Sequence, residues 1–301
     1  MQRQRALVRS LGTPCVPAEH AAAVEEQLAK HKTFKASLES EWYKVTDNGS
    51  FRTYAPKQSD GIKELRCYAE GTLDCSLSVA LSLFNDATLM KTLDQNVERI
   101  DVLHQDAHNS VKHVTMKGIM FTAPREVVSF DHWRVDPATS AVHKCGFSIE
   151  RADVPEHPDP SVKVRAKTRG WSIVTPDEHD GNKVHLQMSV DIDVRLEHVP
   201  AWVQRTVGGS AQKINAQTFA TNLATINKLA KAAQRKAPSS HVVVNQGGEV
   251  AKDGADALVA EPIAKEVDDF SDLRALDVLI AIMLCVTYSS ALFFPAGLGA
   301  A

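Results

Sequence analysis

An unbroken alternation of apolar and polar residues over positions 184–196 constrains the fold more than any other feature of the chain. The even-numbered residues from Val184 to Leu196 are all apolar, whereas the odd-numbered residues between them are all polar or charged. Successive side chains of a β-strand point to opposite faces, so a strand with this pattern buries one face and exposes the other to water. The pattern therefore predicts a strand of an antiparallel sheet with one apolar face.

Other segments of the chain show the same period of two. The additional runs occupy residues 64–70, 112–120, 141–149 and 162–168. Over 127–135 the pattern does not identify the buried face, although Asp131 and Trp133 share a face there. Together these runs predict a single antiparallel sheet that is apolar on one side.

Helical patterns flank the predicted strands. Residues 19–41 suit an N-terminal helix, and two short helices are expected within 77–93. Pro200 favours the start of a last helix, which Gly208-Gly209 is expected to break or kink. Beyond the glycines, the sheet-facing stripe of this helix would consist of Ala216, Phe219, Leu223, Ile226 and Ala230. Sheet and helix would then enclose a space, which predicts an α+β container for a ligand.

The C-terminal part of the chain differs from the body in charge and hydropathy. Residues 237–273 contain eight acids against two lysines, which favours a flexible acidic linker. Residues 274–296 are mostly apolar and long enough to cross a bilayer as a helix. Basic residues precede this segment and none follows it, so we expect a single-pass C-terminal anchor with the body in the cytosol, in the endoplasmic reticulum membrane. The alternative is a buried helix or a docking peptide.

The expected organisation is one folded domain over residues 20–236, preceded by an N-terminal extension over 1–19. The five cysteines are far apart and include no CxxC pair, which favours a reducing compartment. Residues 1–10 are polar and basic, with no apolar run of signal-peptide length behind them.

Enzyme signals in the sequence are weak. The chain has no Gly-x-Ser-x-Gly, no phosphate-binding glycine loop and no HExxH motif. On a strand His104 and His108 would lie about 13 Å apart, too far to share one zinc ion. The low charge, with no aromatic residues among the basic ones, disfavours nucleic-acid binding. We therefore expect no catalysis, no cofactor and no metal.

Asp191 and Asp193 stand two apart on the predicted strand and could form an acid/base pair. They belong to its polar side, however. A turn centred near His179 would place Asp191 across from Lys167, and Asp193 across from Arg165. Ordinary cross-strand ion pairs on a solvated face are therefore the favoured interpretation.

An ordered set of short motifs over residues 20–236 resembles the START family (steroidogenic acute regulatory protein-related lipid transfer). The set comprises Trp42-Tyr43, Pro124-Arg125-Glu126, Val164-Arg165, Gly170-Trp171, Asp191 and Pro200-x-Trp202. The resemblance implies a helix-grip fold, in which a curved antiparallel sheet wraps a long C-terminal helix and leaves a tunnel for one lipid. It also implies that the Pro-rich loop 153–160 resembles the family's lid. The chain departs from the family at Leu93-Asp94, where the family has Trp-Asp.

Within the implied tunnel, Asp131 and His143 are the polar groups able to orient a headgroup, and Asp131 suits a cationic or hydroxyl-bearing one. Asp131 occupies a position where sterol-binding members can carry an arginine, and Met116 stands near their paired acid. The full set of candidate ligand contacts is Met116, Met120, Asp131, Trp133, His143, Phe147, Met188, Ile192, Phe219 and Leu223.

The sequence thus predicts a protein that binds one membrane lipid, a phospholipid, sphingolipid or sterol, and transfers it between membranes. One alternative is a lipid-sensing or tethering protein without net transfer. Another is an enzyme on the same fold, as in polyketide cyclases, which would need convergent polar groups inside the tunnel.

Overall fold

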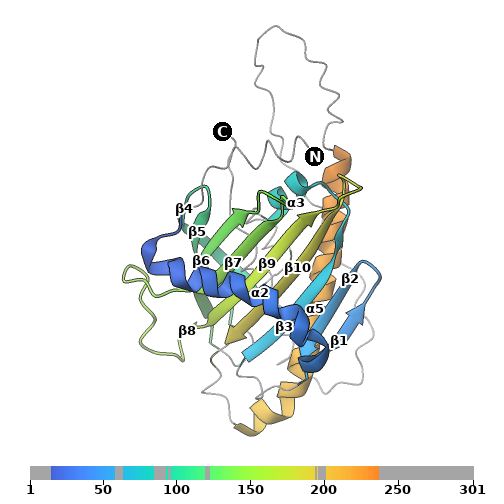
Figure 1. Ribbon diagram of the computed structural model, residues 1–301. Coiled ribbons are helices and arrows are strands. Elements are labelled where there is room, and N and C mark those ends of the chain that lie inside the picture. Colours follow the sequence, from blue (N-terminus) through green and yellow to red (C-terminus); the bar gives the residue numbers. More distant parts are fainter. Residues whose placement is uncertain are drawn as a thin grey trace.

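A computed structural model of the protein describes residues 15–57, 64–84, 93, 96–118, 123–193, 195 and 201–236, with the backbone alone over 201–209. These residues form a ten-stranded sheet between two long helices, α2 and α5 (Figure 1). The predicted linker over 237–273 and anchor over 274–296 lie outside the described residues. Of the helices in the described ranges, none has the length and apolar character needed to cross a bilayer.

The sheet runs in the order β1-β2-β3-β10-β9-β7-β6-β5-β4, and neighbours on this path pair antiparallel. The short strand β8 pairs in parallel with the start of β6. The strands are β1 (Trp42–Asp47), β2 (Phe51–Pro56), β3 (Glu64–Leu73), β4 (Val97–Gln105), β5 (Asn109–Met116), β6 (Arg125–Val135), β7 (Val142–Ser148), β8 (Val164–Arg165), β9 (Lys167–Pro176) and β10 (Val184–Asp193).

The helices agree with the sequence pattern in part. A short 3-10 turn, η1 (Ala18–His20), leads into α2 (Ala21–Glu41), and α3 (Leu77–Phe84) is the first of the two short helices expected within 77–93. Of the second, the structure describes only Leu93. The last helix, α5 (Ala201–Lys236), is continuous through Gly208-Gly209, so the predicted break is wrong. Each glycine costs a helix only about 1 kcal/mol, which packing of the long helix on the sheet offsets.

The two faces of the sheet are covered by different helices, as Figure 1 shows. The inner face lies toward α5, which packs on β1, β2 and β3, and the outer face lies toward α2, which packs on β7, β9 and β1. The even-numbered residues of β10, from Val184 to Ile192, belong to the inner core with Phe219 and Leu223 of α5. The outer core gathers Val24 and Leu28 of α2 around aromatic side chains of the sheet. Both faces are therefore buried over much of the sheet.

The turn between β9 and β10 sets a register that differs from the predicted one by two residues. Asp191 lies across from Arg169, and Asp193 lies across from Lys167. The Asp177 carboxylate accepts hydrogen bonds from the backbone N–H groups of His179 and Asp180, which centres the turn on Asp180 instead of His179. Asp191 still forms a cross-strand ion pair, as expected, but its partner is Arg169, whose Nε lies 3.1 Å from Asp191 Oδ2.

The run over 162–168 is also not one strand. Val164 and Arg165 form β8 and pair with Arg125 and Glu126 of β6, whereas β9 begins at Lys167 and pairs with β10 and β7. A chain that passes from one partner strand to another cannot keep a single face throughout. Arg165 is buried as a result, so the prediction that it lies across from Asp193 on a solvated face is wrong.

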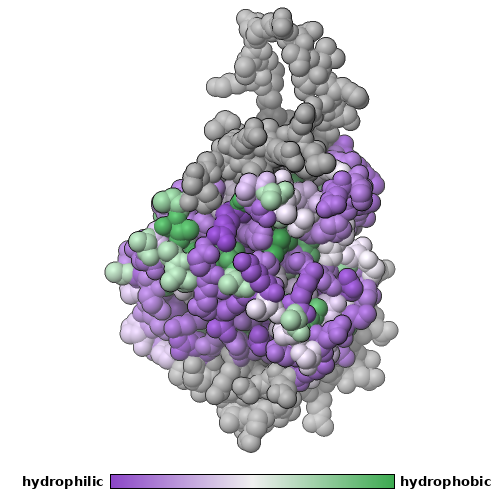
Figure 2. Space-filling model, viewed as in Figure 1, coloured by the Kyte–Doolittle hydropathy of each residue, from purple (hydrophilic) through white to green (hydrophobic). Residues whose placement is uncertain are grey.

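The surface on the α2 side is mostly hydrophilic, with only small apolar groups between the polar ones (Figure 2). Among the described residues, the large hydrophobic side chains that remain exposed are Tyr43, Val102 and Val162. Most of the apolar surface of the described chain is therefore buried in its two cores.

Candidate functional site

The inner face gathers most of the predicted ligand contacts. The strands supply them at alternate positions, and α5 supplies two from its apolar stripe. The residues brought together in the inner core are Met116, Trp133, Met188, Ile192, Phe219 and Leu223. All are buried. Their convergence between sheet and α5 is what the alternation and the helical stripe predict, and their contact with a ligand stays a prediction.

His143 and Phe147 do not belong to this site. Both lie on the outer face, where the ring of His143 is 5.3 Å from that of His31 and the ring of Phe147 is 5.6 Å from that of Phe130. The sequence shows that β7 alternates, but it does not show that α2 covers the apolar side of β7. His143 therefore cannot orient a headgroup on the inner face, and this part of the prediction is wrong. Met120 lies outside the described residues.

Asp131 points to the inner face and forms the centre of a buried charged group, the Asp131 cluster, with Lys112 and Lys144. Lys112 Nζ donates to Asp131 Oδ2 at 2.8 Å, and Lys144 Nζ lies 3.6 Å from Oδ1. Asp131 and Lys112 are fully buried, and Lys144 is 5% exposed. The three residues come from the neighbouring strands β5, β6 and β7. The cluster thus places two ammonium groups and one carboxylate in the interior.

Burial dominates the electrostatics of Lys144. It lowers the pKa of the ammonium to about 7, since desolvation disfavours the charged form; Asp131 raises the pKa, and Lys112 lowers it. Asp131 keeps a lysine on each side, which offsets part of the cost of burying its charge. Lys144 therefore changes its charge near neutral pH.

Several neutral polar groups accompany the cluster on the inner face. Ser110 Oγ lies 3.4 Å from Asp131 Oδ2. Across the described part of the chain, the buried Oγ of Ser129, Oγ1 of Thr168 and Oδ1 of Asp131 make no hydrogen bond. Most buried polar atoms in proteins have a hydrogen-bond partner, so these atoms are available to a further polar group.

Sequence reasoning missed both lysines of the cluster. Lys112 shares a face with Val114 and Met116, and Lys144 shares one with Val142. Lysine is rarely buried, so neither was a candidate for the interior. The signal that could have revealed Lys112 is the alternation of β5, because Lys112 is an even number of residues from the apolar side chains of that strand and therefore shares their face. For Lys144 the alternation gives no such signal, because both faces of β7 are covered and apolar residues occur on each.

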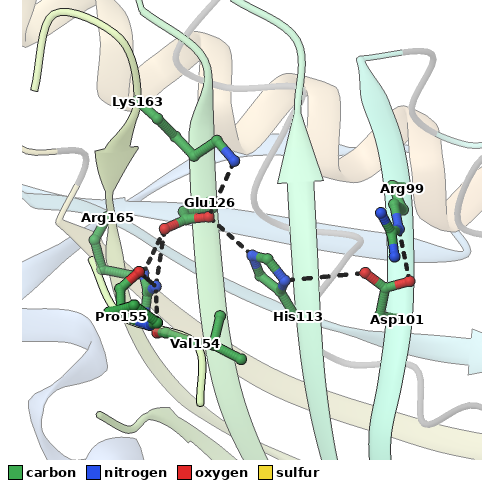
Figure 3. Close-up of polar contacts among 8 residues, drawn as sticks. All are labelled: Arg99, Asp101, His113, Glu126, Val154, Pro155, Lys163 and Arg165. Atoms are coloured by element: carbon green, nitrogen blue, oxygen red, sulfur yellow. Dashed lines mark hydrogen bonds and ion pairs between the residues drawn. The ribbon is translucent and has the colours of Figure 1, made fainter. Parts of the chain in front are cut away.

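On the outer face Glu126 holds a second buried ionic network, shown in Figure 3. Arg165 donates to Glu126 Oε1 from Nε at 3.1 Å and from Nη2 at 2.8 Å. His113 Nε2 lies 2.9 Å from Oε2, and Lys163 Nζ lies 3.5 Å from it. Burial raises the pKa of Glu126, but the bonds from Arg165 and His113 outweigh it and the pKa is lowered. This carboxylate is therefore held in its charged form.

The same arginine fixes the start of the Pro-rich loop 153–160. Arg165 Nη2 donates to the carbonyl oxygens of Val154 at 2.9 Å and of Pro155 at 3.3 Å, as Figure 3 shows. Val154 also packs against the outer core. The loop implied to be a lid is thus tied at its first residues to β6 and β8.

Comparison with known proteins gives a fold and no family assignment. No family model matches the sequence, and no curated protein matches it. The structure is similar to human STARD10, with a TM-score of 0.55 and 13% sequence identity over 75% of this chain and 87% of that one. It is also similar to human StAR-related lipid transfer protein 5, with a TM-score of 0.53 and 15% identity over 71% of this chain and 98% of that one. The chain has a START-like fold, which confirms the helix-grip prediction from the sequence.

Proposed function

We propose that this protein binds one lipid between the inner face of the sheet and α5, and transfers it between membranes. The observation that carries the proposal is the coexistence, on one buried face, of the apolar side chains around Met188 and of polar atoms without partners beside Asp131. An amphiphile needs both environments, one for its chains and one for its polar end. The START-like fold supports the same assignment.

In this mechanism the protein binds and releases the lipid, and no covalent bond is made or broken. Acyl chains or rings of the lipid would replace contacts among Met116, Met188 and Leu223, and each Å² of apolar surface removed from water contributes roughly 25 cal/mol. Entry requires α5 to move away from the sheet, a conformational step of the kind that controls access to many enclosed sites.

A membrane anchor at 274–296 would hold the domain near its own membrane and raise its effective concentration there. A linker of the length of 237–273 has a reach of about 30 to 35 Å as a flexible chain, so exchange with a second membrane would require close apposition. In this proposal the domain faces the cytosol, and the membrane is that of the endoplasmic reticulum.

The test is a photo-crosslinking and transfer experiment on the full-length protein reconstituted in vesicles. Vesicles carry a lipid with a photoactivatable group on its acyl chain, and crosslinked peptides are mapped by mass spectrometry. We expect labelling of peptides that contain Met188 or Leu223, together with protein-dependent movement of the lipid to acceptor vesicles. Labelling confined to residues 274–296, with no transfer, would contradict the proposal.

A matched pair of variants on α5 separates binding in the interior from contact with the surface. Leu223→Phe enlarges a buried side chain that faces the sheet, whereas Ala224→Phe places the same ring on the exposed side of the helix. We expect Leu223→Phe to lower labelling and transfer about tenfold, and Ala224→Phe to leave both unchanged. Labelling without transfer in the wild type would favour the lipid-sensing alternative.

A further inference from the structure

We propose that the bound lipid ends in an uncharged hydroxyl group that lies over Gly146 on the inner face. There it donates a hydrogen bond to Asp131 and accepts one each from Ser129 and Thr168. This inference rests on the proposed function and specifies the class of its ligand. Of the two headgroup types that the sequence suggests for Asp131, cationic and hydroxyl-bearing, it selects the second.

The first argument is a row of hydroxyl side chains that crosses the inner face on three neighbouring strands. Ser129 of β6 lies across from Ser148 of β7, and Ser148 Oγ accepts a hydrogen bond of 2.9 Å from the backbone N–H of Thr168 on β9. At the two ends of the row, Ser129 Oγ and Thr168 Oγ1 are buried and make no hydrogen bond among the described residues. A buried hydroxyl without a partner is costly, so a ligand that bonds to both removes this cost.

The second argument is a pair of glycines next to this row. Gly146 of β7 lies across from Asp131 on one side and from Gly170 of β9 on the other, and both glycines are buried. Neither has a positive φ, since among the glycines of the described ranges only Gly49 has one. Their backbone conformation therefore does not require glycine. What the pair provides is a part of the inner face without side chains, beside Asp131 and the hydroxyl row.

The third argument is the position of Gly146 relative to the three polar groups. Asp131 lies directly across from it, while Ser129 on β6 and Thr168 on β9 are its diagonal neighbours on either side. Diagonal neighbours on one face of an antiparallel pair lie about 7–8 Å apart, within reach of side-chain contact. An oxygen atom over Gly146 is therefore near all three groups.

The fourth argument is that the hydrogen-bonding capacity of these groups matches that of one hydroxyl. Asp131 Oδ1 makes no hydrogen bond within the described part of the chain, and its contact with Lys144 Nζ, at 3.6 Å, is longer than a hydrogen bond. A hydroxyl has one proton to donate, which suits this oxygen, and two lone pairs, which suit the two side-chain hydroxyls. An ester carbonyl or ether oxygen can only accept, and a quaternary ammonium group can do neither.

The experiment uses the full-length protein in vesicles and two matched pairs of photoactivatable lipids. One pair is a diacylglycerol and its O-methyl ether, and the other is a sterol and its O-methyl ether. A phosphatidylcholine with the acyl chains of the diacylglycerol is the fifth probe. In at least one pair we expect the hydroxyl lipid to label peptides that contain Met188 or Leu223 about tenfold more than its ether, and more than the phosphatidylcholine. The pair with this preference identifies the source of the hydroxyl.

Variants of the two hydroxyl residues assign the preference to this site. Ser129→Ala and Thr168→Val each remove a hydroxyl that makes no hydrogen bond to another described residue, so neither breaks such a bond of the fold. We expect each to lower labelling by the hydroxyl lipid to about that of its ether. The matched control is Thr53→Val on β2, which is separated from β9 by β3 and β10. It removes a hydroxyl that is also buried and listed with no hydrogen bond in the described ranges, and it should leave the preference unchanged.

A variant of the glycine pair tests where the hydroxyl binds. Gly146→Ala adds a methyl group at the position assigned to the ligand oxygen, without requiring a new backbone conformation. We expect it to abolish the preference for the hydroxyl lipid. The control is Gly181→Ala in the turn before β10, where an added methyl group meets no atom within 4 Å, and it should change nothing.

The outcomes separate this inference from the proposed function. Equal labelling of the inner face by the hydroxyl lipids and their ethers, or stronger labelling by the phosphatidylcholine, overturns the hydroxyl assignment and leaves lipid binding intact. A preference that survives Ser129→Ala, Thr168→Val and Gly146→Ala also overturns it. No labelling of the inner face by any probe overturns the proposed function itself. The order of the probes on the wild type decides between these results even where a variant does not fold.

Discussion

Strand β6 carries two buried carboxylates, Asp131 on the inner face and Glu126 on the outer face, and their surroundings differ. Glu126 accepts two hydrogen bonds from Arg165, and both His113 and Lys163 lie within ion-pair distance. Asp131 is bonded to Lys112 through one oxygen, while its other oxygen makes no hydrogen bond within the described ranges. One carboxylate has its acceptor sites filled, and the other keeps capacity for a further group.

The difference separates a structural role from a binding role. A buried ionic network fixes the elements that contribute to it, and the Glu126 network joins β5, β6, β8 and the start of loop 153–160. The Asp131 cluster joins β5, β6 and β7, which main-chain pairing already holds together. Its ion pairs therefore join no elements beyond those that the sheet already holds together.

The largest expected effect comes from removing the centre of the cluster. Asp131→Asn leaves two buried ammonium groups without their carboxylate, and breaking a buried pair in this way costs about 3–5 kcal/mol in the free energy of unfolding. The loss should shrink above pH 7, where Lys144 releases its proton. Pulse proteolysis in urea on the full-length protein in vesicles measures the change.

The control for this variant is Asp191→Asn on β10. Asp191 also pairs with two cations, Arg66 and Arg169, but its side chain is 15% exposed and faces the outer side. We expect a loss of about 1 kcal/mol or less, as is usual for ion pairs near solvent. Equal losses at Asp131 and Asp191 would show that the cluster is solvated like a surface pair.

A smaller effect is expected at Glu126. Glu126→Gln keeps an oxygen that can accept from Arg165 but loses the charge, and hydrogen bonds to charged groups contribute about 1.5–3 kcal/mol. Because the pKa of Glu126 is lowered in the folded state, its contribution is complete above the usual glutamate value. It is lost as the pH falls below that value toward the lowered one.

The measurement is the free energy of unfolding of wild type and Glu126→Gln across acidic pH. The difference between them should be constant near neutral pH and decrease as the medium becomes more acidic. A difference that grows on acidification would contradict a lowered pKa for Glu126. Proteolysis within loop 153–160 should also become faster in Glu126→Gln, because Arg165 holds the first residues of that loop.

Much of the fold could be predicted from the sequence, because alternation and helical stripes are direct consequences of burial. The strand at 184–193, the N-terminal helix and the inward stripe from Ala216 to Ala230 all appear where the pattern places them. Motif order then identified the START-like arrangement. Where two elements cover both sides of one strand, as at β7, period two alone cannot tell the inner side from the outer.

The candidate site could be predicted only in its apolar part. Met188, Ile192 and Phe219 follow from alternation and stripe, but the assignment of His143 required knowing which side α2 covers. The partners of Asp131 depend on the register of three strands, which brings Lys112 and Lys144 to the two oxygens of one carboxylate. Contacts between residues that are far apart in the chain produce no local pattern in the sequence, so these ion pairs could not be predicted.

The smallest effect on stability at neutral pH is expected for Lys144→Met. Methionine has a similar volume, and replacement of a buried ionic group by a well-packed apolar one is often neutral or stabilising. The informative quantity is the pH dependence. In the wild type the pKa of Lys144 is about 7 when folded against 10.5 ordinarily, so the unfolded chain binds more protons between these values. The stability of the wild type should therefore rise with pH from about 7 toward 10.5 relative to Lys144→Met. Parallel curves over this window would show that Lys144 keeps its proton inside the protein and would contradict a lowered pKa.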